Sequence, residues 1–204
     1  MSKGQQRKGH PRRSPPPTPY HKQTAISDSL RQTLLPQANQ LPLVGCWMTA
    51  NWSHSEQGLV QAIIAREQPD GRVAYASFLV DVYCLGVKDA HHDMNLTAER
   101  FEIVWNHLAS LQPLVEAPIE AAHQLIYQAI DYAARWGFKP HPDFAKASYF
   151  LAPRGTYPED YQLTFGKDGK PFFVQGPHDN VRAVVAQLER TAGQGNYNYM
   201  VHAE

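Results

Sequence analysis

Hydrophobic residues along the chain follow two periods, one of two residues and one close to 3.6. Alternating or continuous apolar runs predict strands over 43–52, 59–67 and 72–85. A Pro-Asp-Gly turn at 69–71 joins the last two runs, which predicts a long hairpin. Both faces of the second arm of this hairpin are apolar, so we expect a central strand that is covered on both sides.

Apolar residues spaced three and four apart predict three main helices. The first should begin after Thr97, a good N-cap residue, and the second should begin after Pro118 and end before Gly137. Either Asp179 or Asn180 should cap the third.

The remaining elements complete the expected fold class. Residues 161–165 and 171–174 predict a second hairpin around the Lys-Asp-Gly turn at 167–169, and residues 144–151 fit either a strand or a short helix. Strands come both before and after the helices. The expected fold is therefore α+β, with a mainly antiparallel sheet, a long hairpin and three main helices.

Composition divides the chain into three parts. Residues 1–40 form a basic, proline-rich arm that we expect to be disordered, 41–194 a single α+β domain, and 195–204 a polar C-terminal tail. The first 31 residues hold seven basic residues and one acidic residue, a net charge of +6. The other residues hold 12 basic and 18 acidic residues, so the net charge of zero is the sum of two opposite parts.

The arm is the strongest physical signal in the sequence. A cluster of cations without neutralising acids attracts polyanions, and such arms order on RNA or ribonucleoprotein. The alternative is a passive, solubilising tail. The candidate nucleic-acid contacts are Lys3, Arg7, Lys8, Arg12, Arg13 and Lys22.

Several classes of protein are excluded by what the sequence lacks. Two cysteines are too few for a disulfide framework, and no apolar run reaches the length of a membrane span. The basic N-terminal stretch has no hydrophobic segment typical of a secretory signal, so we expect a soluble cytoplasmic protein without membrane contact. No phosphate-binding loop or nucleophile elbow occurs, and the sequence requires no cofactor.

Asp81 is the first candidate for chemistry, because it interrupts the apolar run 78–87. A buried carboxylate is costly unless it is paired, so Asp81 is a candidate catalytic group or metal ligand on a central strand. The alternative is a structural carboxylate bonded to the backbone or to Lys88.

A second set of candidates combines histidine with carboxylate. Asp89, His91 and His92 have side chains that suit a divalent metal, although a solvated loop between strand and helix explains the same residues. His141 and Asp143 lie in a rigid proline-rich loop that can hold a general base or be purely structural.

His123 stands three residues after Glu120, a spacing found in di-iron carboxylate proteins. Those proteins use two such pairs, and this chain has one. His123 also falls on the apolar stripe of the second helix, which favours a core histidine bonded to a single partner over a catalytic residue.

Three segments together resemble a group of bacterial proteins without an established activity: VDVYCLGVKDA (80–90), WGFKPHPDF (136–144) and FGKDGKPFFVQGPHDN (165–180). Some members of that group carry cysteine-rich tails of the SEC-C type, which this chain lacks. A glycine-phenylalanine loop with a nearby histidine is similar to part of type II ribonuclease H, but the first strand here has no acidic residue. The resemblance therefore implies no activity.

Three functions follow from these observations. The leading expectation is an intracellular protein that binds RNA or a ribonucleoprotein through its basic arm. The alternatives are a metal-dependent hydrolase or nuclease built around Asp81, and a module that binds a protein partner without nucleic acid.

Overall fold

In the computed structural model, the main sheet has five antiparallel strands in the order β4-β3-β2-β1-β5. The structure describes residues 29, 33–54, 56 and 58–201. The strands are β1 (Leu43–Thr49), β2 (Leu59–Glu67), β3 (Val73–Asp81), β4 (Gly86–Leu96), β5 (Leu114–Glu116), β6 (Phe172–Val174) and β7 (Asn198–Met200). The helices are η1 (Leu35–Gln40), η2 (Trp52–His54), α2 (Ala98–Leu111), α3 (Ile119–Arg135), α4 (Phe144–Ala147), η3 (Ser148–Phe150) and α5 (Val181–Thr191). The mixture of helices and an antiparallel sheet confirms the α+β class.

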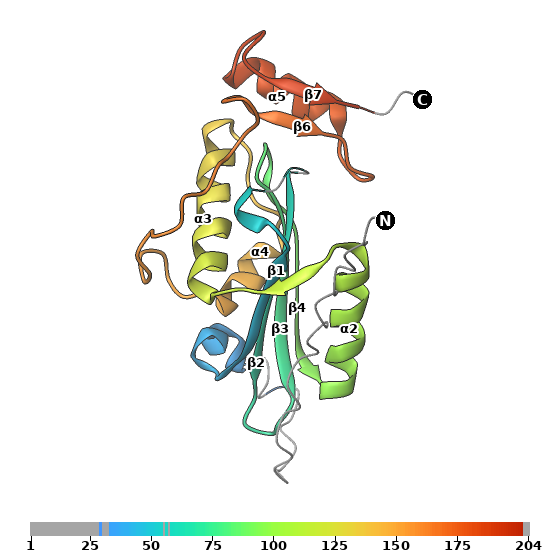
Figure 1. The fold of residues 1–204 in the computed structure, drawn as a ribbon, viewed down its shortest axis with the longest axis vertical. Coiled ribbons are helices and arrows are strands. Elements are labelled where there is room, and N and C mark those ends of the chain that lie inside the picture. Colours follow the sequence, from blue (N-terminus) through green and yellow to red (C-terminus); the bar gives the residue numbers. More distant parts are fainter. Residues whose placement is uncertain (1–28, 30–32, 55, 57, 202–204) are drawn as a thin grey trace, which may run out of the picture.

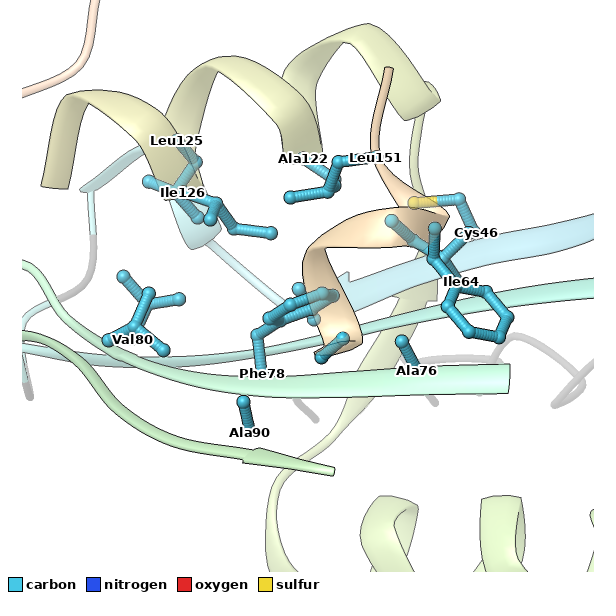
Figure 2. Close-up of a cluster of buried hydrophobic side chains, with 14 of the residues drawn as sticks. Cys46, Ile64, Ala76, Phe78, Val80, Ala90, Ala122, Leu125, Ile126 and Leu151 are labelled. Atoms are coloured by element: carbon cyan, nitrogen blue, oxygen red, sulfur yellow. The ribbon is translucent and has the colours of Figure 1, made fainter. Parts of the chain in front are cut away.

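Helices cover both faces of the main sheet, with α3 and α4 on one side and α2 on the other (Figure 1). Alternate residues of β3 point to opposite faces, as a pleated strand requires. Phe78 and Val80 are fully buried on the α3 side, and Figure 2 shows both beside Ile126 of α3. Tyr75 lies in the core on the α2 side. The central strand is therefore covered on both faces, as its sequence predicts.

Aromatic rings fill the smaller core under α2. Trp47 of β1 lies 6.0 Å from Phe101 and 6.3 Å from Trp105 of α2, measured between ring centroids. Tyr75 of β3 approaches Phe101 to 5.9 Å. The apolar residues that are spaced three and four apart from Phe101 to Leu108 thus form the face that α2 packs on the sheet.

The predicted helix boundaries and first hairpin are confirmed. The side chain of Thr97 accepts a hydrogen bond from the amide of Arg100 and caps α2. Gly137 follows α3 with a φ of 81°, a left-handed conformation that favours glycine. Asn180, rather than Asp179, caps α5, because its side chain accepts from the amide of Ala183.

The loop interpretation of residues 88–93 is wrong, because these residues belong to β4. β4 lies at the edge of the sheet, and its pairing with β3 shifts register twice. Charged residues and bulges are usual on edge strands, where they discourage pairing with other chains. The density of polar residues that suggested a loop is therefore explained by an edge position.

The second predicted hairpin is also wrong. Residues 161–165 form no strand, and β6 pairs instead in parallel with β7, which lies in the segment assigned to a polar tail. The turn itself is present, since Lys167 and Lys170 form an isolated antiparallel bridge. Figure 1 shows β6, β7 and α5 gathered beyond one end of the main sheet, where they form a small β-α-β unit.

The folded part begins before Leu41. η1 packs on the core through Ala38, which is fully buried. The guanidinium of buried Arg66 donates to the carbonyl of Leu41 at 2.7 Å and to that of Phe150 at 3.2 Å. Arg66 therefore holds the segment after η1 against η3.

Candidate functional site

Asp81 ends β3 and is nearly inaccessible to solvent. Its Oδ1 accepts hydrogen bonds from the amides of Tyr83 at 2.8 Å and Cys84 at 3.0 Å. Burial raises the pKa of Asp81 to about 6, against the opposing effect of Lys88 and of these backbone amides. The carboxylate thus stabilises the tight connection between β3 and β4. These contacts are those of a structural carboxylate bonded to the backbone, the alternative to a catalytic group or metal ligand.

Gly86 closes the same connection in a conformation that other residues rarely adopt. Its φ is 70°, and a Cβ at this position would lie 3.0 Å from both the carbonyl oxygen of Ala129 and the Cβ of Ala133. Helix α3 therefore packs directly on the start of β4, which requires a residue without a side chain.

Lys88 joins β4 to the β-α-β unit. Its Nζ lies 2.6 Å from Oδ2 of Asp179, and both side chains are largely buried. The same Asp179 oxygen accepts from the amide of Gly176 at 2.7 Å. Asp179 is therefore held by an ion pair and a backbone bond instead of serving as the helix cap.

A small apolar core lies beside these charges. Its fully buried members are Cys84 from the β3–β4 connection, Phe173 from β6 and Leu188 from α5. Burial, with nearby Asp81, raises the pKa of the Cys84 thiol, and burial raises the pKa of Cys46 to about 12. Neither thiol is a nucleophile at neutral pH, since the thiolate is the reactive form.

Three segments that are distant in the sequence meet at this place. The carbonyl of Val82 accepts from the amide of Gly166 at 2.9 Å, and that of Tyr83 accepts from Phe172 at 3.1 Å. The carbonyl of Val87 accepts from the amide of His141 at 2.9 Å. We call this meeting of residues 80–90, 136–144 and 165–180 the hairpin junction. Its buried contacts are backbone bonds, one ion pair and apolar packing, and they hold these three segments together.

A group of three polar side chains lies at the outer edge of β4. The Nδ1 of His141 is 3.7 Å from Oδ2 of Asp143 and 4.0 Å from Oδ1 of Asp89. The fold brings Asp89 to the loop that follows α3, which the sequence alone did not predict. All three side chains are open to solvent, with 36% of His141 and 67% of Asp89 exposed.

His91 and His92 do not join this group. No hydrogen bond or ion pair links either ring to Asp89, His141 or Asp143 in the described structure, and the ring of His91 packs 5.7 Å from that of Tyr75. Burial, with nearby His91 and Lys146, lowers the pKa of His92. Among the residues that the structure describes, no three histidine, cysteine, aspartate or glutamate side chains are placed to hold a metal ion.

His123 is a buried residue of α3 that fixes the loop after η3. Its Nε2 lies 2.9 Å from the carbonyl oxygen of Ala152 and 3.2 Å from that of Pro153. Tyr127 and Tyr157 pack edge-on against its ring, with centroids at 4.6 and 5.1 Å. These contacts are those of a histidine in the protein core, as the sequence favours.

Two cavities lie in the described part of the chain. One, of about 450 Å3, lies between α3 and the loop 159–165 and is lined by Asp131, Tyr132 and Arg135 among others. The other, of about 500 Å3, lies beside the end of β1 and the start of β5. Their walls come from distant parts of the chain, so no local pattern in the sequence indicates them.

The six candidate nucleic-acid contacts of the arm, from Lys3 to Lys22, lie outside the described residues. Within the described part of the chain, no helix has the length and apolar character to cross a bilayer. Comparison of the chain with protein-family models, with curated proteins and with solved structures gives no match.

Proposed function

We propose that this protein binds RNA or a ribonucleoprotein through its cationic N-terminal arm, and that the folded part is the scaffold to which the arm is attached. The observation that carries the proposal is the division of charge, with a net +6 over residues 1–31 and a net −6 over the rest. A polyanion is attracted to the first part and repelled by the second, so contact is directed to the arm.

The cations of the folded part support this division, because several of them are already neutralised. Arg154 makes two contacts of 2.7 and 2.8 Å with the carboxylate of Asp131, and Lys88 pairs with Asp179. Arg66 is buried and bonds to carbonyl groups. Part of the positive charge of the folded part is therefore already engaged within the fold.

Binding is also better supported than hydrolysis by the surroundings of the candidate catalytic residues. The Oδ1 of Asp81 accepts hydrogen bonds from two backbone amides, and the Nε2 of His123 lies within hydrogen-bond distance of two backbone carbonyl oxygens. The remaining candidates, Asp89, His141 and Asp143, stand open to solvent on the edge of β4. A catalytic group ordinarily lies in a cleft that excludes water.

The proposal is tested by measuring the affinity of the full chain for single-stranded RNA as a function of salt. Six phosphate contacts give a slope of log K against log salt of about −4, which lowers the affinity by a factor of about 300 between about 50 and about 200 mM salt. Replacing the six arm cations by glutamine should abolish this binding.

A matched control removes the same charge from the folded part. Six of its exposed cations are replaced by glutamine: Arg100, Lys139, Lys146, Lys167, Arg182 and Arg190. The control should retain most of the affinity. Equal loss in both variants, or no RNA binding by the unaltered chain at low salt, would contradict the proposal.

A further inference from the structure

We propose that β7 is the contact through which two copies of this chain associate, by pairing antiparallel to form one sheet in the order β6-β7-β7-β6. In a single copy, β6 and β7 form a parallel sheet of two strands with α5 beside it. Parallel sheets are normally larger and buried, and two-stranded sheets are marginally stable alone. The unit is therefore incomplete as a sheet.

The backbone of β7 has an open outer edge. The amide of Asn198 donates to the carbonyl of Pro171, and the carbonyl of Met200 accepts from the amide of Gln175, both at 2.9 Å. Because backbone groups alternate in direction along a strand, those of Tyr199 point away from β6. Neither backbone group of Tyr199 bonds to another part of the described chain.

Apart from its short length of three residues, this edge lacks the features that protect edge strands. Residues 191–201 include no charged residue and no proline. The side chains at the edge are apolar and accessible, with 51% of Tyr199, 58% of Met200 and 40% of Val201 exposed. The long edge strand of the main sheet, β4, carries Asp89 and Asp93 and two shifts of register. The chain thus protects β4 against pairing and leaves the edge of β7 available.

The occupant that fits this edge is a second copy. Antiparallel pairing about a two-fold axis at Tyr199 lets each Tyr199 exchange two backbone hydrogen bonds with its equivalent. Since 191–201 is uncharged, no like charges face each other in this arrangement. Tyr197 and Tyr199 already stack, with centroids 6.2 Å apart, so pairing would extend this stack across the axis.

The basic arm of the same chain is a poorer occupant. Five of the nine residues from 11 to 19 are prolines, which have no amide hydrogen to donate to a neighbouring strand. The β7 strand of a second copy supplies both amide donors and carbonyl acceptors.

The test is the molar mass of the full chain in solution, measured by light scattering and by sedimentation at concentrations up to about 0.1 mM. We expect a concentration-dependent dimer for the unaltered chain. Tyr199→Lys places two like charges at the axis and should give a monomer, as should Tyr199→Glu. Mixing these two variants should restore a dimer, because opposite charges then face each other. Ile103→Lys, at an apolar α2 residue that is 63% exposed, should not alter the dimer.

A second variant tests the register and does not depend on charge. Tyr199→Cys brings two equivalent cysteines to about 5.5 Å between Cα atoms, within the range that a disulfide spans. Mild oxidation should then give a covalent dimer, whereas Cys46 and Cys84 are buried and should not react. A monomeric unaltered chain, or a dimer that survives in both Tyr199→Lys and Tyr199→Glu, would overturn the proposal.

Discussion

Asp81 offers a direct measurement of the energy of its buried charge. The variant Asp81→Asn keeps an acceptor oxygen for the amides of Tyr83 and Cys84 and removes the titrating group. In the folded protein, burial raises the pKa of Asp81 from 3.8 to about 6. The folded state therefore binds this proton more tightly than the unfolded chain does.

The sign of the effect follows from this difference. Protonated Asp81 stabilises the fold fully below about pH 4, and this contribution is lost as the pH rises through 6. A pKa difference of about two units corresponds to about 3 kcal/mol in total. Between pH 4.5 and 7.5, linkage gives a loss of about 2 kcal/mol from this group.

Urea unfolding at these two pH values measures the effect. The free energy of unfolding of the unaltered chain should fall by about 2 kcal/mol more than that of Asp81→Asn. Asp89→Asn is a matched control, because this carboxylate is in the same hairpin and 67% exposed. Its pH dependence should stay within about 0.5 kcal/mol of that of the unaltered chain. Parallel pH profiles for the unaltered chain and Asp81→Asn would refute the reasoning.

Two further substitutions test the packing around the hairpin junction and α3. Gly86→Ala should lower the free energy of unfolding by about 2 kcal/mol or more, because a Cβ would meet α3 and the φ of 70° disfavours alanine; a change below about 0.5 kcal/mol in urea unfolding would contradict this. His123→Ala should free the loop after η3 and speed tryptic cleavage after Arg154, an exposed residue of that loop. Cleavage at the unaltered rate would show that His123 does not fix the loop.

The parts of the fold that follow a local pattern could be predicted from the sequence. The hairpin of β2 and β3 has a turn signal and alternating faces, and α2 has both a cap and an apolar stripe. The strand β4 was not predicted, because an edge strand with charged residues has the composition of a loop. The pairing of β6 with β7 depends on a crossover through α5, and three-residue strands give too little periodicity to detect.

The candidate site shows the same limit. The sequence correctly indicates that Asp81 is unusual, but its partners are backbone amides, which no pattern of side chains reveals. The approach of His141 to Asp89 depends on how the loop after α3 runs beside β4. The function assigned to the arm rests on charge alone and remains a prediction.

The hairpin junction also determines when this protein can finish folding during its synthesis. Cys84 is buried against Phe173 and Leu188, which follow it by about 90 and 104 residues. At about 5–20 residues per second, roughly 5–20 s pass between the synthesis of Cys84 and that of Leu188. During this interval the tip of the β3–β4 hairpin lacks its apolar partners, and Lys88 lacks Asp179. A nascent chain that stops before β6 therefore exposes a reduced thiol and an unpaired lysine, a state that thiol-reactive labelling of ribosome-bound chains would detect.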